Sequence, residues 1–121
     1  MIQIKDNIKY LGTITAANFI TSSDERLKDF TSDISIDFDK LKTIPKKTYY
    51  WKDKEKYSSD LQIGTSAQAL QKVYPECVNY DEANDSYSVD YQKLSIVALA
   101  AIDILNERIS KLEEIILNSS K

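Results

Sequence analysis

The stretch LSIVALAAIDILNERISKLEEIILN, residues 94–118, decides the fold class of this chain. Beyond Ala98 its apolar residues recur at alternating steps of three and four: Ile102, Leu105, Ile109, Leu112 and Ile116. Such steps form a heptad repeat, in which one apolar seam per helix packs against other helices. Residues 94–118 are therefore predicted to form a helix that joins copies of the chain. Ile and Leu along the seam favour two strands, but Ile115 widens the apolar face, so the number of chains stays open.

The composition of the chain indicates one small globular domain, because 42% of its 121 residues are hydrophobic and 29% are charged. A net charge of -3 disfavours nucleic acid and other polyanions as partners. The chain has no histidine and only two glycines, which excludes histidine triads, HExxH zinc sites and glycine-rich phosphate loops. The apolar run Ile96–Leu105 is too short to span a membrane. The single cysteine, Cys77, is expected to be a small buried hydrophobe.

Residues 1–21 alternate apolar and polar side chains, with the period of an extended chain. Strands, or a ladder of short strands, are predicted here on both sides of Gly12. A segment this short cannot bury a sheet face alone. We therefore interpret it as the end of a larger β-structure.

A helix start is predicted where hydroxyl side chains precede acids at residues 21–25. Ser22 as the N-cap and Glu25 three residues later would form a capping box, with a short helix running to about Phe30. Two interpretations of the next segment stay open. Apolar residues alternate over 34–38, as in a strand, whereas those at 38, 41 and 44 have the spacing of a helical turn that Pro45 would end.

Short elements are predicted through the middle of the chain. Aromatic and β-branched residues favour a strand over 47–52, and a charged loop follows at 54–60. Apolar spacing predicts a helix over 65–73. A polar turn at 81–86 predicts a hairpin across residues 78–89. The acids of this turn do not have the spacing of an EF-hand loop, so we interpret them as a solvated turn.

Five sequence blocks occur in order along the chain. They are SDERLK at 23–28, LKTIP at 41–45 with YWKD at 50–53, GTSAQ at 64–68, YPECV at 74–78 and SVDYQKL at 88–94. Together they resemble the C-terminal intramolecular chaperones of bacteriophage tail spikes, tail fibres and neck appendages, also called peptidase S74 or the endosialidase chaperone domain. The resemblance covers about residues 21–117. It implies an α+β fold, with short helices and small β elements before a long C-terminal coiled-coil helix, assembled as a homotrimer.

The resemblance also implies a function. In this family the chaperone helps three chains of a fibre or spike to fold, and then releases itself by cutting before the serine of the first block. By position, the scissile bond joins Ser22 to Ser23, residues 1–22 are the end of the fibre stalk, and residues 23–121 are the released chaperone. Assembly would take place in the host bacterial cytoplasm, and the fibre part would stay in the virion. The implied partners are two further copies and the upstream fibre polypeptide, with no nucleic acid, membrane, metal or cofactor.

The catalytic residues implied by the resemblance are Ser23 and Lys28, in a serine endopeptidase that acts once on its own chain. A serine hydroxyl becomes a nucleophile when a neutral lysine takes its proton. Five residues on an ideal helix turn about 500°, which leaves the two side chains about 140° apart, so Ser23 must lie outside the helix in the cap position. Gln68 is a candidate supporting residue. Its amide would polarise the scissile carbonyl, or would be buried and close a backbone hydrogen bond.

Two other functions fit parts of the sequence. The first is a trimerisation and folding cap that does not cleave, in which Ser23 is only a helix cap. The second is a fragment of a membrane-tethered eukaryotic transcription factor, because the same self-cleaving domain occurs there. The absence of an apolar span and of a basic DNA-binding region in these residues disfavours the second function.

Overall fold

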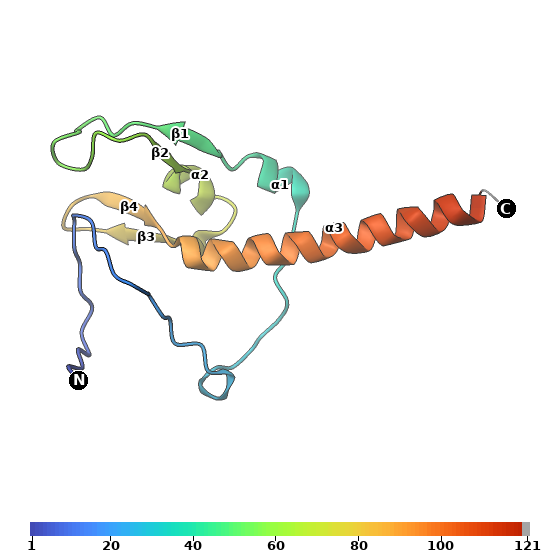
Figure 1. Ribbon diagram of the computed structural model, residues 1–121, viewed down its shortest axis with the longest axis horizontal. Coiled ribbons are helices and arrows are strands. Elements are labelled where there is room, and N and C mark those ends of the chain that lie inside the picture. The colour runs from blue at the N-terminus through green and yellow to red at the C-terminus, as the bar shows by residue number, and fades with distance from the viewer. Residues whose placement is uncertain (120–121) are drawn as a thin grey trace. The chain divides into compact units, whose positions relative to one another are not determined.

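The computed structural model describes residues 1–119 and divides the chain into two compact units. The first unit comprises residues 1–31 and 48–62, and the second comprises residues 32–47 and the chain from residue 63 onward. In chain order the elements are η1 (Glu25–Leu27), α1 (Phe38–Lys42), β1 (Lys47–Tyr49), β2 (Gln62–Gly64), α2 (Ala67–Gln71), η2 (Pro75–Cys77), β3 (Val78–Asp81), β4 (Ser86–Val89) and α3 (Tyr91–Ser119). β1 pairs with β2 and β3 with β4 (Figure 1). These short helices, small sheets and long C-terminal helix confirm the predicted α+β class.

The core of the second unit forms around Ile44, Leu70 and Cys77, whose side chains are at most 5% exposed. Partly buried hydrophobic residues pack around these three: Leu41, Val73, Tyr74, Val78, Val89 and Leu94. The burial predicted for Cys77 is therefore confirmed. Burial, and then the nearby carboxylate of Glu76, raises the pKa of the thiol, which keeps it protonated and poorly nucleophilic.

The two interpretations of residues 34–44 are resolved in favour of a helix. Asp37 caps α1, because its Oδ1 accepts hydrogen bonds from the backbone N–H groups of Asp39 (3.0 Å) and Lys40 (3.3 Å). These bonds satisfy donors that have no partner inside a helix. No strand forms over residues 34–38. The alternation in that stretch belongs to an extended lead-in to α1.

The helix predicted over 65–73 is confirmed as α2, although it is shorter than expected. Ser66 caps it, since its hydroxyl oxygen accepts a hydrogen bond from Ala69 N–H at 3.1 Å. After Gln71 the chain turns into η2, which has Pro75 in its first turn. Proline is favoured at that position because it has no N–H to leave unsatisfied.

The predicted hairpin is confirmed, with Val78 opposite Val89 and Tyr80 opposite Tyr87 in an antiparallel pair. The two tyrosine rings lie 4.8 Å apart between centroids. In the turn Asp85 has a φ of 45°, a conformation that costs energy for any residue with a side chain. The hydroxyl of Tyr80 donates to Asp85 Oδ1 at 2.6 Å, which holds the turn and raises the pKa of Tyr80.

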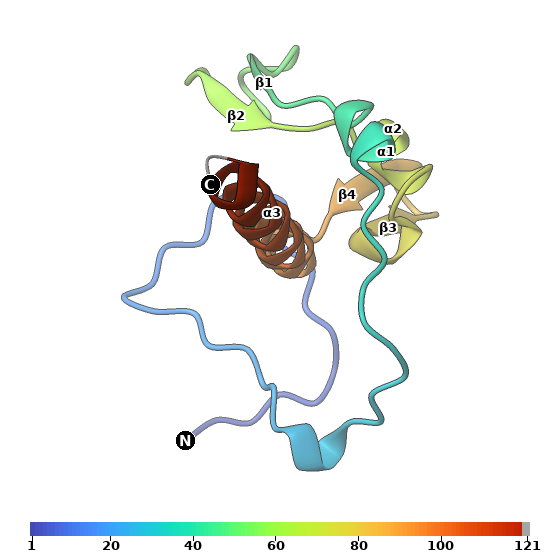
Figure 2. The same ribbon diagram turned by 90° about the vertical axis from the view of Figure 1, so that its right-hand side faces the viewer.

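The predicted terminal helix is confirmed and begins a little earlier, at Tyr91. Asp90 lies just before it and accepts a hydrogen bond from Lys93 N–H at 3.1 Å, so its carboxylate satisfies a donor of the first turn. α3 follows β4 directly and is seen nearly end-on in Figure 2 as one continuous helix. Its first turns pack on the core of the second unit through Leu94, and Val97 one turn later is buried as well.

The strands predicted over residues 1–21 do not form, and the prediction is wrong for the single chain. The segment is irregular, and its apolar side chains are exposed, with Ile2 and Ile20 at 88% and Ile8 at 70%. A strand needs a partner for its backbone N–H and C=O groups. The pattern of the segment is that of a strand, but it has no partner strand within the described residues.

The strand predicted over 47–52 is confirmed only over Lys47–Tyr49. Past Tyr49 the chain enters the charged loop expected at 54–60, and Trp51 stacks on Tyr57 with ring centroids 4.4 Å apart. Tyr49 meets the edge of the same indole ring at 5.4 Å. This aromatic contact orders the loop of the first unit, in which no described residue is fully buried.

Candidate functional site

The segment that carries Ser23 and Lys28 is built around η1, which lasts a single turn. The predicted capping box with Ser22 and a helix to Phe30 is wrong, because the N-cap is Asp24. Its Oδ1 accepts a hydrogen bond from Arg26 N–H at 3.0 Å. The hydroxyls before it, at positions 22 and 23, are therefore not used as caps.

Arg26 fixes the carboxylate that caps this turn. Its Nε donates to Asp24 Oδ1 at 3.1 Å and its Nη2 donates to Oδ2 at 2.7 Å, so the guanidinium makes a bidentate contact with the carboxylate. This side-chain hydrogen bond, and then the backbone N–H of Arg26, lowers the pKa of Asp24. The ionised cap and the two-point contact set the geometry of the residues on either side.

Ser23 and Lys28 are in direct contact. Lys28 has left the helix in an extended conformation, with φ −125° and ψ 148°, and its Nζ donates to Ser23 Oγ at 2.5 Å. The separation of about 140° expected on a regular helix does not arise, because η1 ends before Lys28 and starts after Ser23. The one-turn helix thus joins the two residues that the sequence resemblance implied.

The side chains of Ser22, Ser23 and Lys28 are all exposed. Water reaches the ammonium group of Lys28, which acts as the donor to Ser23. The single chain brings Ser23 Oγ and Lys28 Nζ into hydrogen-bond contact, and both side chains are open to water.

Comparison with known proteins finds a family similarity that begins at this contact. Residues 23–79 match the family model described as the chaperone of endosialidase, peptidase S74. Residues 23–79 are thus similar to this chaperone family. The family match begins at Ser23, the residue whose hydroxyl contacts Lys28, and ends within β3. No curated protein and no solved structure matches the chain.

Gln68, the candidate supporting residue, lies in α2, in the second unit, whereas Ser23 and Lys28 belong to the first. Its side chain is exposed. The interpretation of Gln68 as a buried amide is therefore wrong. An exposed amide on a capped helix remains free to face a neighbouring segment or chain.

Hydrogen bonds between the sequence blocks were not expected from the sequence. The Tyr91 hydroxyl accepts a hydrogen bond from Thr65 N–H at 3.2 Å, which joins the GTSAQ and SVDYQKL blocks. Cys77 C=O accepts a hydrogen bond from Asp90 N–H at 2.8 Å, which joins the YPECV block to the SVDYQKL block. Lys93 Nζ also reaches Glu76 C=O at 3.2 Å. These hydrogen bonds hold the start of α3 against the GTSAQ and YPECV blocks.

Two kinds of site are absent from the described residues. Within residues 1–119 no helix combines the length and the apolar character that crossing a membrane requires. The same part of the chain does not gather three or more of the acidic, cysteine or histidine side chains that could hold a metal ion.

Proposed function

We propose that this chain is the C-terminal intramolecular chaperone of a bacteriophage tail fibre, tail spike or neck appendage, and that it releases itself by cutting the bond between Ser22 and Ser23. The hydrogen bond between Lys28 Nζ and Ser23 Oγ, at the first residue of the family match, carries this proposal. Residues 1–22 are the end of the fibre stalk, and residues 23–121 are the chaperone. The active form is a homotrimer.

The cleavage follows from the positions of these atoms. Ser23 Oγ attacks the carbonyl carbon of Ser22 while its proton passes to the neutral amine of Lys28. The five-membered adduct collapses, the C–N bond breaks, and the lysine returns its proton to the departing amine of Ser23. The product is an ester between the Ser22 acyl group and Ser23 Oγ. Water hydrolyses this ester, which leaves a carboxylate at Ser22 and a new N-terminus at Ser23.

The assembled trimer would supply the surroundings that favour a neutral Lys28, which the single chain lacks. A lysine acts as a base only after it has lost its proton, and burial or nearby positive charge favours the neutral form. The exposure of Lys28 in the single chain means that another surface must cover it. The exposed heptad seam of α3 and the exposed apolar side chains of residues 1–21 are surfaces through which copies would associate. Cleavage would then follow trimerisation and report that folding is complete.

The place and partners of the reaction follow from this role. The chain folds with two further copies and the upstream fibre polypeptide in the host bacterial cytoplasm. After cleavage the fibre part enters the virion and the chaperone is released. The second candidate function, a trimerisation cap that does not cleave, gave Ser23 the role of helix cap. That role belongs to Asp24, so the geometry favours the cleaving chaperone.

The test is the intact mass of the chain expressed behind a trimeric stretch of fibre. The wild type should yield a fragment that begins at Ser23, and Ser23→Ala should yield none. Lys28→Arg is the sharper variant, because arginine still donates to the serine but cannot act as a base at ordinary pH. Ser22→Ala is the matched control and should cleave, since only its carbonyl reacts. A full-length Ser22→Ala and wild type, both trimeric, would leave the non-cleaving cap as the function.

A further inference from the structure

α3 has two apolar stripes that meet different surroundings. The inner stripe packs on the second unit and consists of Leu94, Val97, Ala101 and Ile104, which are buried or half-buried. The outer seam, about 80° around the helix, consists of Ile102, Leu105, Ile109, Leu112 and Ile116, which are 44–65% exposed. The chain's own fold therefore uses one stripe and leaves the other uncovered.

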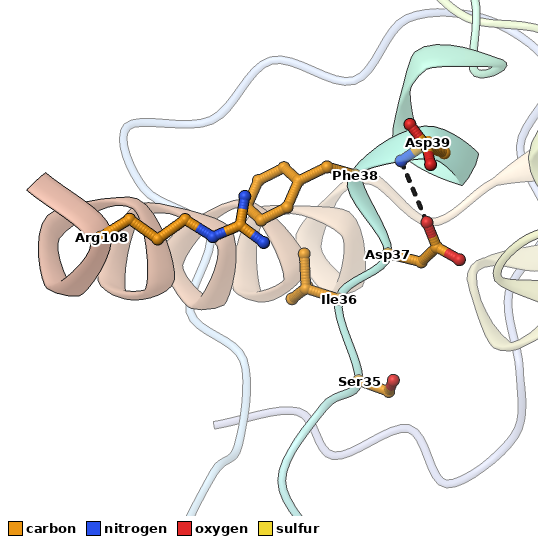
Figure 3. A pocket seen from close by; sticks show the side chains of 6 residues that line it. All are labelled: Ser35, Ile36, Asp37, Phe38, Asp39 and Arg108. Atoms are coloured by element: carbon orange, nitrogen blue, oxygen red, sulfur yellow. Dashed lines mark hydrogen bonds between the residues drawn. The ribbon is translucent and has the colours of Figure 1, made fainter.

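Arg108 continues the spacing of the inner stripe, four residues after Ile104. Its guanidinium lies over the ring of Phe38, with 4.7 Å from Cζ to the ring centroid (Figure 3). Together with residues 35–39 it lines a shallow hollow of about 450 Å³. The cap of α1 by Asp37 fixes the backbone at Phe38. The domain thus holds the Arg108 side chain in a set direction.

The heptad positions give Arg108 a second role. With Ile102 and Ile109 at a and Leu105 at d, Arg108 occupies g and Glu113 occupies e of the following heptad. In a parallel, in-register coiled coil, residue g of one helix faces residue e five positions later on its neighbour. Arg108 and Glu113 are five positions apart and have opposite charges. The preceding g and e positions hold Ala101 and Asn106, which carry no charge.

We infer that Arg108 of one copy pairs with Glu113 of the next, in the parallel, in-register coiled coil that the proposed homotrimer would form along the outer seam. This deepens the proposed function and rests on its homo-oligomer. The cation–π contact with the Phe38 ring forms no conventional hydrogen bond, so the N–H donors of the guanidinium stay available for a carboxylate. Phe38 therefore orients Arg108 before the copies meet, and the ion pair selects the parallel register.

A charge swap tests the pairing. Arg108→Glu and Glu113→Arg should each weaken the trimer about 100-fold in its dissociation constant, because three attractive contacts become repulsive. The double variant should return to within about threefold of the wild type, since each charge again meets its opposite. Lys111→Glu and Glu114→Arg make the same charge changes at c and f positions, away from the seam, and should have much smaller effects. Sedimentation equilibrium measures all five, with helix content checked by circular dichroism.

Two further variants separate the parts of the inference. Phe38→Leu should weaken the wild-type trimer but not the charge-swapped double variant, which has no guanidinium at position 108 to stack on the ring. Ile116→Cys, exposed to oxidised glutathione, should form a disulfide between copies, because only parallel register brings residue 116 of two helices together. The wild type, with Cys77 buried, is the control.

The outcomes distinguish this inference from the proposed function. A wild-type chain that stays monomeric would overturn both. Wild-type trimers with no rescue by the double swap, or with no disulfide through residue 116, would overturn the parallel Arg108–Glu113 pairing and leave the trimeric chaperone standing. Rescue together with the disulfide supports the inference.

Discussion

Replacing Ile109 by alanine removes the central side chain of the outer seam, and the proposed trimer should dissociate as a result. The side chain is 55% exposed in the single chain, so about half of its surface remains to be covered by other copies. The substitution removes three carbons, which contribute about 0.8 kcal/mol each when fully buried. Scaled by the exposed half, the loss is about 1.3 kcal/mol per chain and about 4 kcal/mol per trimer. The trimer association constant should therefore fall roughly 1,000-fold.

Sedimentation equilibrium over a range of concentrations measures this change, and the chain itself offers a matched control. Ile96 has the same side chain and nearly the same exposure, 53%, but lies outside the seam. Ile96→Ala removes the same carbons from the same helix at a similar cost in helix propensity. It should leave association within a few-fold of the wild type. Equal weakening by both variants would refute the assignment of the seam, because the loss would then come from the helix and not from its contacts.

Two other predictions concern the folded chain. Leu70 is fully buried, so Leu70→Ala should lower the free energy of unfolding, measured by urea titration, by about 3 kcal/mol or more. The control Leu61→Ala, at a side chain that is 56% exposed, should change this free energy by less than about 0.5 kcal/mol. Similar losses in the two variants would contradict the position of the core. Arg26→Ala should raise the pKa of Asp24 toward its ordinary value in a carboxyl NMR titration, because the guanidinium holds it down. In the wild type, the stability that the ionised Asp24 cap contributes should be present above the ordinary aspartate pKa and lost as the pH falls through the lowered pKa of Asp24. An unchanged Asp24 titration midpoint in Arg26→Ala would contradict the two-point contact between Arg26 and Asp24.

The parts of the fold that depend on near neighbours could be predicted from the sequence. The spacing of apolar residues located α3, the polar turn located the hairpin, and the apolar residues after Ser66 located α2. In each case the side chains that define the element lie within a few residues of one another. The resemblance also named Ser23 and Lys28, whose contact requires only that the helix between them be short.

The remaining features depend on contacts that sequence spacing does not specify. Ser22 and Asp24 are both acceptable caps, and the choice of Asp24 depends on the guanidinium of Arg26 gripping its carboxylate. The strand pattern of residues 1–21 needs a partner outside the segment to become a strand. The contact between Arg108 and Phe38 joins two residues 70 positions apart. The helical step of four from Ile104 places Arg108 on the inner stripe of α3, but it does not indicate which residue Arg108 contacts.

The balance of buried and exposed side chains links folding to the proposed cleavage. Across residues 1–119 four hydrophobic side chains are buried, whereas the exposed ones include the whole outer seam and most apolar residues of the first 20 positions. Small domains with so little core gain much of their stability by association. We therefore infer that the chain reaches its most stable state only with other copies. A dyad whose base is exposed in the single chain is suited to that order of events, because the contacts that complete the fold are the ones able to remove water from Lys28.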